Sequence, residues 1–204
     1  MLGLPPAQLR MLAAVFIAVP ISSWGAVYPE NTWLQVGPVL LVVALLAPAL
    51  RRWPMSDGSL AWFAGFLLLH LFAARWTYSS VPYDKWGVSL AGFSIDAALG
   101  FQRNMFDRLV HFAFGLCMIA PLTEIGRRYH SMSPRLALTF SLLFIWAGSA
   151  FYEVFEWLLA VIMDPAAAEA YNGQQGDMFD PQKDMLAAGL GALMGASFPT
   201  RRRR

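Results

Sequence analysis

Six long stretches of the chain contain almost no charged side chain, and this pattern constrains the fold more than any other feature. A helix needs about 17–25 mostly apolar residues to cross the hydrocarbon core of a bilayer, and the six stretches come near this length once short flanks are included. Charged residues make up only 14% of the chain, against roughly a quarter in soluble domains. The sequence therefore predicts one all-α membrane domain over residues 1–204. It would be a polytopic bundle of about six transmembrane helices, with spans near 11–29, 31–50, 58–76, 107–126, 136–163 and 184–200.

Charge is distributed unevenly between the predicted spans. If six spans alternate, the side with both termini carries ten basic and two acidic residues, whereas the other side carries five basic and eleven acidic residues. Because cytoplasmic loops are enriched in Lys and Arg, we predict that both termini are cytoplasmic. The terminal run Arg201–Arg204 fits this topology and contact with anionic lipid better than nucleic-acid binding. The expected partner is the lipid bilayer and not nucleic acid, and the oligomeric state stays open.

Two predicted outer connections, 77–106 and 164–183, are longer than ordinary turns and are expected to carry structure or function. In the first of them, the apolar segment Val88–Phe101 predicts a short helix on or in the outer leaflet, where it could act as a lid. In the last span, Gly191 and Gly195 form a GxxxG pattern. This pattern permits a close helix contact, either within the chain or in a dimer.

Ionisable side chains gather at the outer ends of the last four predicted spans. Asp107 and His111 are four residues apart, which places them on the same face of a helix. Glu153 and Glu156 are three residues apart in the outer third of the fifth span. Carboxylates at such a depth are costly and are seldom retained without a cation, a proton or a metal.

Imidazoles and carboxylates at one level are suitable ligands for a divalent metal whose identity the sequence does not fix. We therefore predict a metal-assisted hydrolase or transferase of the outer leaflet, acting on a lipid-linked phosphate or an envelope precursor. Two alternatives remain open: a non-catalytic carrier of an ion, a proton or a small molecule, and a structural subunit whose charges pair with one another. The predicted metal ligands are His70, Asp107, His111 and Asp177, with Glu153 or Glu156 as a further ligand; the catalytic acids and bases are Glu153, Glu156, Asp180 and Asp184; the cations for an anionic headgroup are Arg75, Arg103, Arg108 and Lys183.

Glu124 does not belong to this cluster. It follows His111 by thirteen residues, which places it about 20 Å deeper along a helix. Its expected partners are Arg127 and Arg128 at the inner surface.

Three motifs give the second half of the chain a recognisable pattern. They are Arg103-Asn-x-x-Asp107-Arg108-x-x-His111-Phe112-x-x-Gly115, Tyr152-Glu153-x-x-Glu156-Trp157, and Gly176-Asp177-x-x-Asp180-x-Gln182-x-Asp184-Met185. Together they resemble the YjdF family of uncharacterised bacterial inner-membrane proteins, and more loosely the VanZ-like membrane proteins. Arg75 and Ser80 depart from the family pattern, in which a histidine and an acid would be expected. The resemblance implies a location in the bacterial inner membrane and supports the choice of site residues, but it supplies no reaction.

Overall fold

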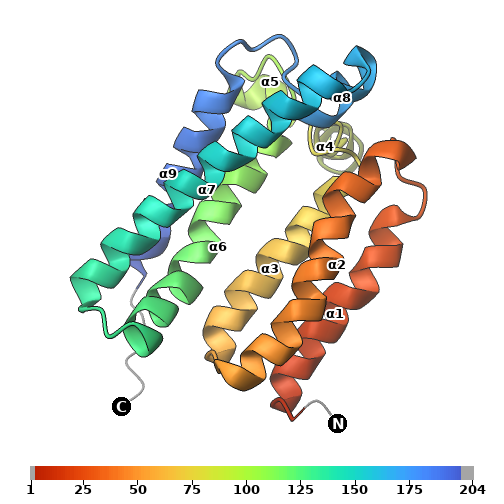
Figure 1. The fold of residues 1–204 in the computed structure, drawn as a ribbon. Helices are drawn as coiled ribbons and strands as arrows, with labels where there is room; N and C mark the ends of the chain where they lie inside the picture. Colours follow the sequence, from red (N-terminus) through yellow and green to blue (C-terminus); the bar gives the residue numbers. More distant parts are fainter. Residues whose placement is uncertain (1–2, 199–204) are drawn as a thin grey trace.

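The computed structural model describes residues 3–198, and these form nine α-helices and no strand (Figure 1). Five helices are long and apolar enough to cross a membrane: α1 (Pro6–Ser23), α2 (Pro29–Arg52), α3 (Asp57–Ala74), α6 (Phe106–Tyr129) and α7 (Pro134–Ile162). The sixth predicted span corresponds to α9 (Asp180–Ser197), whose first five residues include three charged side chains. Three short helices complete the fold: α4 (Tyr83–Ala91), α5 (Ile95–Leu99) and α8 (Pro165–Asn172). The chain is an all-α polytopic membrane protein, as predicted.

The first helix lies earlier in the chain than predicted. It ends at Ser23, whereas the predicted span continued to residue 29. Gly25 adopts a φ of +63°, a left-handed conformation that is free of strain only for glycine, and Pro29 begins α2. These two residues make a turn where composition alone suggested a continuous apolar run.

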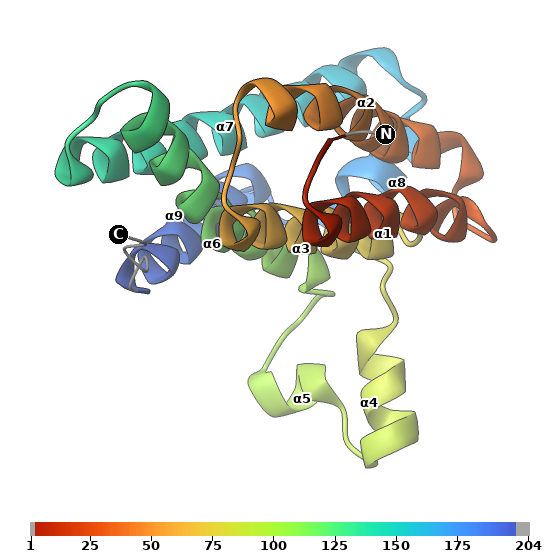
Figure 2. The same ribbon diagram turned by 90° about the horizontal axis from the view of Figure 1, so that it is seen from below.

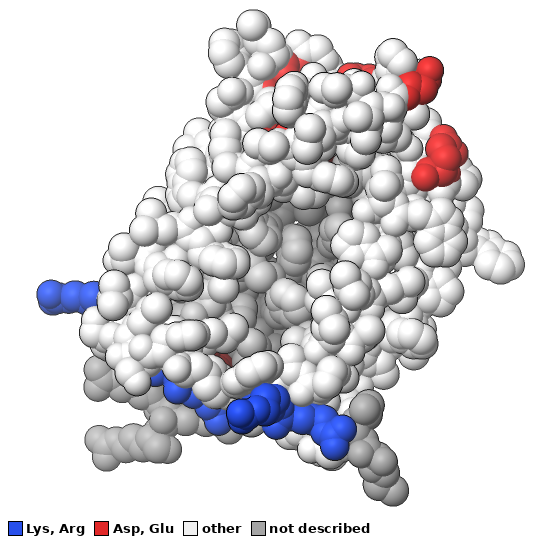
Figure 3. All heavy atoms as spheres, in the orientation of Figure 1, with Lys and Arg blue, Asp and Glu red and all other residues white. Residues whose placement is uncertain are grey.

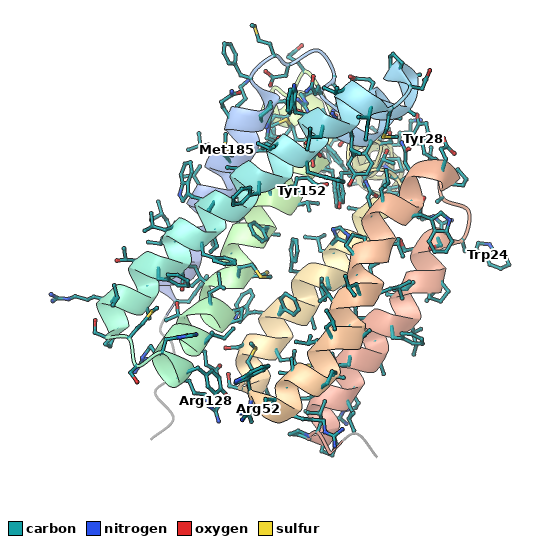
Figure 4. The ribbon with its side chains drawn as sticks, in the orientation of Figure 1. Trp24, Tyr28, Arg52, Arg128, Tyr152 and Met185 are labelled. Carbon is teal, nitrogen blue, oxygen red and sulfur yellow. The ribbon has the colours of Figure 1, made fainter. Side chains whose placement is uncertain are left out.

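Basic and acidic side chains separate along the long axis of the bundle. Figure 3 shows Lys and Arg along the lower edge of one face and Asp and Glu at its upper edge. Figure 4 places Arg52, at the end of α2, and Arg128, near the end of α6, at this basic end. The distribution supports the predicted cytoplasmic orientation of that end, although Arg201–Arg204 lie outside the described residues.

The bundle consists of two halves, α1–α3 and α6–α9, joined where α3 packs against α6. In Figure 2, α2 and α7 form one layer, and α1, α3 and α6 form the layer behind it. Each half has a core of buried apolar side chains, and a smaller cluster of Ala73, Tyr78, Val81 and Val110 lies where the halves meet. The first core includes Val15, Val36, Val39, Leu67 and Leu71, and the second includes Cys117, Met118, Ile145, Ala188 and Ala192.

Glycines bring α6 and α9 into backbone contact. A Cβ atom on Gly115 would lie 1.8 Å from the carbonyl oxygen of Ala188, and one on Gly191 would lie 1.9 Å from that of Phe112. A Cβ on Gly195 would also be crowded, at 2.7 Å from the nearest backbone atom of α6. The GxxxG pattern therefore serves packing within the chain, where small residues allow helix backbones to approach closely. This contact holds the first turn of α9 against the first turns of α6.

The segment between α3 and α6 differs from its prediction. Instead of one helix over Val88–Phe101, it forms α4 and α5, because Gly92 adopts a φ of +76° and ends α4. Figure 2 shows both helices projecting from the layer that contains α1, α3 and α6. The hollow in Figure 3 is on the opposite face, so the segment does not cover it, and a role as a lid over the charged residues stays a prediction.

Candidate metal centre

Asp107 and His111 occupy the first two turns of α6, and both are buried. Asn104 fixes the start of this helix: its Oδ1 accepts a hydrogen bond from the Phe106 N–H at 3.0 Å, and its Nδ2 donates to the Val81 carbonyl at 2.7 Å. The four-residue spacing brings His111 Nε2 within 3.7 Å of Asp107 Oδ1. The two side chains therefore share one helix face, as their spacing predicts.

Two other helices bring carboxylates to the same place. Asp107, His111 and Asp184 of α9 each offer one ligand atom, and these atoms lie within 4.8 Å of one another. Glu153 of α7 adds an oxygen, Oε1, at 3.8 Å from His111 Nε2. All four residues are buried, and the first and last of them are more than 70 residues apart in the sequence. We refer to Asp107, His111, Glu153 and Asp184 as the acid–histidine cluster.

The carboxylates of this cluster are not fully satisfied by the chain. Among the described residues, no donor hydrogen-bonds to Asp107 Oδ1, Glu153 Oε1 or Asp184 Oδ1, although all three oxygens are buried. Buried polar atoms are nearly always paired, and an unpaired carboxylate in an apolar interior is costly. The arrangement therefore has the composition and the unused oxygen atoms of a cation site.

Arg108 connects the cluster to a second group of charges. Its guanidinium lies 2.8 Å from Asp184 Oδ1, in an ion pair that lacks hydrogen-bond geometry. It also donates to Asp180 Oδ1 at 2.5 Å and to Asp177 Oδ2 at 3.1 Å. With 11% of its side chain exposed, Arg108 is enclosed by these partners.

Arg103 and Lys183 belong to the same group of ion pairs. Arg103 pairs with Asp180 and donates to the carbonyl oxygens of Gly173 and Gln174. Lys183 Nζ lies 2.6 Å from Asp177 Oδ2, and this hydrogen bond lowers the pKa of Asp177 below its usual value.

These ion pairs bear on several predicted roles, which stay predictions. Arg103, Arg108 and Lys183 were expected to hold an anionic substrate, but they are engaged by carboxylates of the same chain. Asp180 bridges two arginines and is not placed as a catalytic acid or base. Asp177 binds cationic side chains and is not a member of the buried trio that could hold a metal. The charges of this group pair with one another within the chain.

His70 and Arg75 also differ from their predicted roles. His70 Nε2 lies 3.0 Å from the Gln35 carbonyl oxygen, and Nδ1 lies 2.8 Å from Tyr78 Oη. Both ring nitrogens have partners within the chain, so a metal at His70 would require one of these two contacts to break. Arg75 donates to the Ile21 carbonyl at 3.4 Å, so it faces the end of α1 and not the predicted headgroup site.

An apolar cavity of about 220 Å³ adjoins the acid–histidine cluster between α3, α6 and α7. Figure 3 shows this face of the molecule hollowed between the two halves, and Figure 4 places Tyr152 on the part of α7 that borders the hollow. His111 is both a member of the cluster and part of the cavity wall. The residues around the cavity are Phe66, His70, Tyr78, Val110, His111, Phe114, Gly148, Ser149 and Tyr152.

Tyrosines near the cluster were missed by the sequence predictions. The Tyr152 ring packs edge-on against His111 with centroids 5.7 Å apart, and its hydroxyl lies 3.4 Å from that of Tyr171. Burial raises the pKa of Tyr78 well above its usual value and that of Tyr171 to about 12, so both remain neutral. Gly148, four residues before Tyr152 on the same face of α7, also lines the cavity, and this spacing was an available signal.

Glu156 is buried one turn after Glu153, and the side chain of Asn172 binds its backbone carbonyl at 3.0 Å. This contact fixes α7 to α8. A catalytic role of the Glu156 carboxylate remains a prediction.

Glu124 forms a separate contact at the opposite end of α6. It accepts hydrogen bonds from the Ser56 N–H at 2.7 Å, from the Ser56 hydroxyl at 2.5 Å and from the Ser59 hydroxyl at 2.6 Å. Of its two predicted partners, Arg128 is confirmed, at 3.4 Å, and no contact with Arg127 is seen among the described residues. The serines begin α3, where free N–H groups favour a carboxylate.

Fold and site together define a polytopic all-α membrane protein with a buried acid–histidine cluster beside an apolar cavity. A family model described as "Predicted membrane protein (DUF2238)" matches residues 7–204. "Inner membrane protein YjdF" of Escherichia coli (strain K12) is 32% identical over 200 residues, which cover 97% of this chain and 91% of that protein. The chain belongs to this family and is an integral protein of the inner membrane, as its motifs predict. The looser resemblance to VanZ-like proteins is not shown, and no solved structure matches the chain.

Proposed function

We propose that this protein is a metal-dependent hydrolase or transferase of the inner membrane, in which the acid–histidine cluster holds one divalent cation. The observation that carries the proposal is the convergence of Asp107, His111 and Asp184 within 4.8 Å, beside buried oxygens of Asp107 and Glu153 for which the described residues supply neither a hydrogen bond nor an Arg or Lys partner. The imidazole of His111 with the carboxylates of Asp107 and Asp184 suits Zn²⁺, Mn²⁺ or Fe²⁺, and Glu153 lies beside this ligand set. A divalent ion would offset two of the three carboxylate charges, and Arg108 beside Asp184 offsets the third.

The cluster contains a candidate general base. A divalent ion in such a site supplies an activated water or a polarised substrate oxygen. Glu153 Oε1 is buried and lacks a donor, so it is free to accept a proton. In hydrolysis, the oxygen of water would bond to the electrophilic atom of the substrate while Glu153 takes one proton of that water. The bond to the leaving group would then break, and the leaving group would receive this proton.

The cavity favours a lipid whose reacting group is uncharged. Its walls are mainly apolar, and the cations once expected to hold a phosphate are engaged in internal ion pairs. The hollow in Figure 3 lies on the side of the bundle, which faces lipid when the bundle spans a membrane. An apolar chain entering there would place its polar linkage next to His111.

Elemental analysis of untagged, purified protein tests the metal site. After equilibration with Zn²⁺ or Mn²⁺ and dialysis, the parent protein should retain about one ion per chain. The His111→Ala and Asp107→Asn variants should lose most of it. His130→Ala is the matched control, because His130 is exposed beyond the end of α6. The site does not exist if the parent retains no ion, or if His111→Ala retains as much as the control.

Catalysis needs a separate measurement. Metal-loaded protein in nanodiscs is incubated with a bacterial lipid extract, and products are followed by mass spectrometry. Glu153→Gln should retain most of the ion and lose turnover. Unchanged turnover in this variant would contradict the assignment of Glu153 as the base.

A further inference from the structure

The segment 82–101, which we call the arm, exposes large apolar side chains. Neither α4 nor α5 contains a buried residue, and Leu90 is 86% exposed. Ordering such a segment costs conformational entropy that buried apolar area normally offsets, and the chain itself covers little of this area. The exposed apolar residues of the arm are Trp86, Val88, Leu90, Phe93 and Leu99.

The arm crosses the direction of the long helices. In Figure 1, α4 is seen along its axis, close to the ends of α3 and α2 that lie away from the basic end of the bundle. Figure 2 shows α4 and α5 extending away from the layer formed by α1, α3 and α6. When the long helices span a bilayer, this position puts the arm along the plane of the membrane at its outer surface.

The two carboxylates of the arm are hydrogen-bonded within the arm, whereas Lys85 and Ser89 are its exposed polar residues. Asp84 accepts hydrogen bonds from the Ser94 hydroxyl and the Asp96 N–H, each at 2.9 Å. Asp96 accepts one from the Tyr83 hydroxyl at 2.5 Å, and the oxygen of that hydroxyl accepts one from the Met105 N–H at 2.9 Å. The carboxylates are therefore hydrogen-bonded inside the arm, while its outward surface is largely apolar.

Aromatic rings connect the arm to the surface of the bundle. Trp86 packs against Trp76 with ring centroids 5.6 Å apart and against Phe72 at 6.2 Å. Phe72 also contacts Phe106 at the start of α6, at 5.9 Å. Trp and Tyr side chains concentrate at the boundary between lipid and water, so this group marks the level of the interface.

We infer that the arm is an interfacial anchor whose apolar surface lies in the outer leaflet of the bilayer, with Leu90 and Phe93 among the acyl chains. A segment that is apolar on one face and internally hydrogen-bonded on the other suits this location. The inference does not depend on the proposed metal site.

Spin-label accessibility in liposomes tests the anchor. In a Cys117→Ser background, a nitroxide is attached to Leu90→Cys on the arm or to Ala166→Cys on α8, an exposed position in the outer connection 164–183. In liposomes of phosphatidylethanolamine and phosphatidylglycerol, the label at 90 should collide readily with oxygen. Its collision rate with a water-soluble nickel chelate should be several-fold lower than that of the label at 166.

Two results would overturn the inference. Equal access of the nickel chelate at 90 and 166 would place the arm in water. Exclusion of both reagents at 90 would mean that protein, either a partner or a second copy, covers the arm. Unlabelled variants must elute like the parent in size-exclusion chromatography, and a second label at Phe93→Cys gives an independent reading if Leu90→Cys fails to fold.

Discussion

Replacing Gly115 by alanine should separate α6 from α9 and open the acid–histidine cluster. The new Cβ would lie 1.8 Å from the Ala188 carbonyl oxygen, about 1.5 Å short of ordinary contact. Both atoms belong to packed helix backbones, so the helices must move apart, at a cost of about 1–3 kcal/mol in the free energy of unfolding. Because α9 carries Asp184, the distance from this carboxylate to His111 should grow by a similar amount. Metal affinity should then fall roughly 10–100-fold, since ligand positions tolerate only small errors.

Gly65→Ala on α3 is the matched control, because no atom lies within 4 Å of its added Cβ. Both variants are purified in the same detergent, and their thermal unfolding and their affinity for Zn²⁺ are compared with the parent. Gly115→Ala should melt at a lower temperature and bind more weakly, whereas Gly65→Ala should match the parent. Parent-like melting of Gly115→Ala would refute the close contact of α6 and α9. Lower melting with unchanged metal affinity would refute the link between this contact and the cluster.

Three further changes test the charged contacts. Arg108→Met should lower the free energy of unfolding by about 3–5 kcal/mol, because it leaves buried carboxylates without a cation. Lys183→Gln, at an exposed position, should lower it by less than about 1 kcal/mol. Equal effects of the two variants in urea unfolding would contradict this difference. Glu124→Ala removes the hydrogen-bond acceptor at the start of α3 and should lower the free energy of unfolding by about 1–2 kcal/mol, measured by thermal unfolding. Arg128→Gln should leave it nearly unchanged. An unchanged stability of Glu124→Ala would show that this contact does not stabilise the fold. The pKa of Asp177 is lowered in the folded state, so the ionised Asp177 stabilises the fold above its unfolded pKa of about 3.9, and this stabilisation is lost as the pH falls further. Asp177→Asn should therefore reduce the loss of stability at acidic pH. A dependence of unfolding on pH that is the same in the parent and in Asp177→Asn would refute this role.

The sequence predicted the helical architecture because crossing a bilayer imposes long apolar runs that composition reveals directly. It also predicted that Asp107 and His111 share a helix face, because helix periodicity fixes that relation. The first predicted span continued to residue 29, whereas α1 ends at Ser23 and Gly25 adopts a turn conformation. The backbone conformation of a glycine cannot be predicted from the hydrophobicity of the surrounding sequence.

Contacts between distant segments were harder to predict. Depth along each helix placed His70 at the level of His111, and both residues line one cavity. The position of a residue along its helix does not determine its hydrogen-bond partners. The two ring nitrogens of His70 contact Gln35 and Tyr78. Similarly, Arg108 was placed correctly at the outer end, but its partners depend on the path of the loop before α9.

X-ray absorption spectroscopy can determine whether the acid–histidine cluster binds a divalent cation. Untagged protein is loaded with one equivalent of Zn²⁺, and the extended fine structure at the zinc edge is measured for the parent and for His111→Ala. We expect one imidazole nitrogen and several oxygens at about 2.0–2.2 Å from the zinc ion, no sulfur ligand, and loss of the imidazole signal in His111→Ala. A fully hydrated ion, a sulfur ligand, or an imidazole signal that persists in His111→Ala would contradict this expectation.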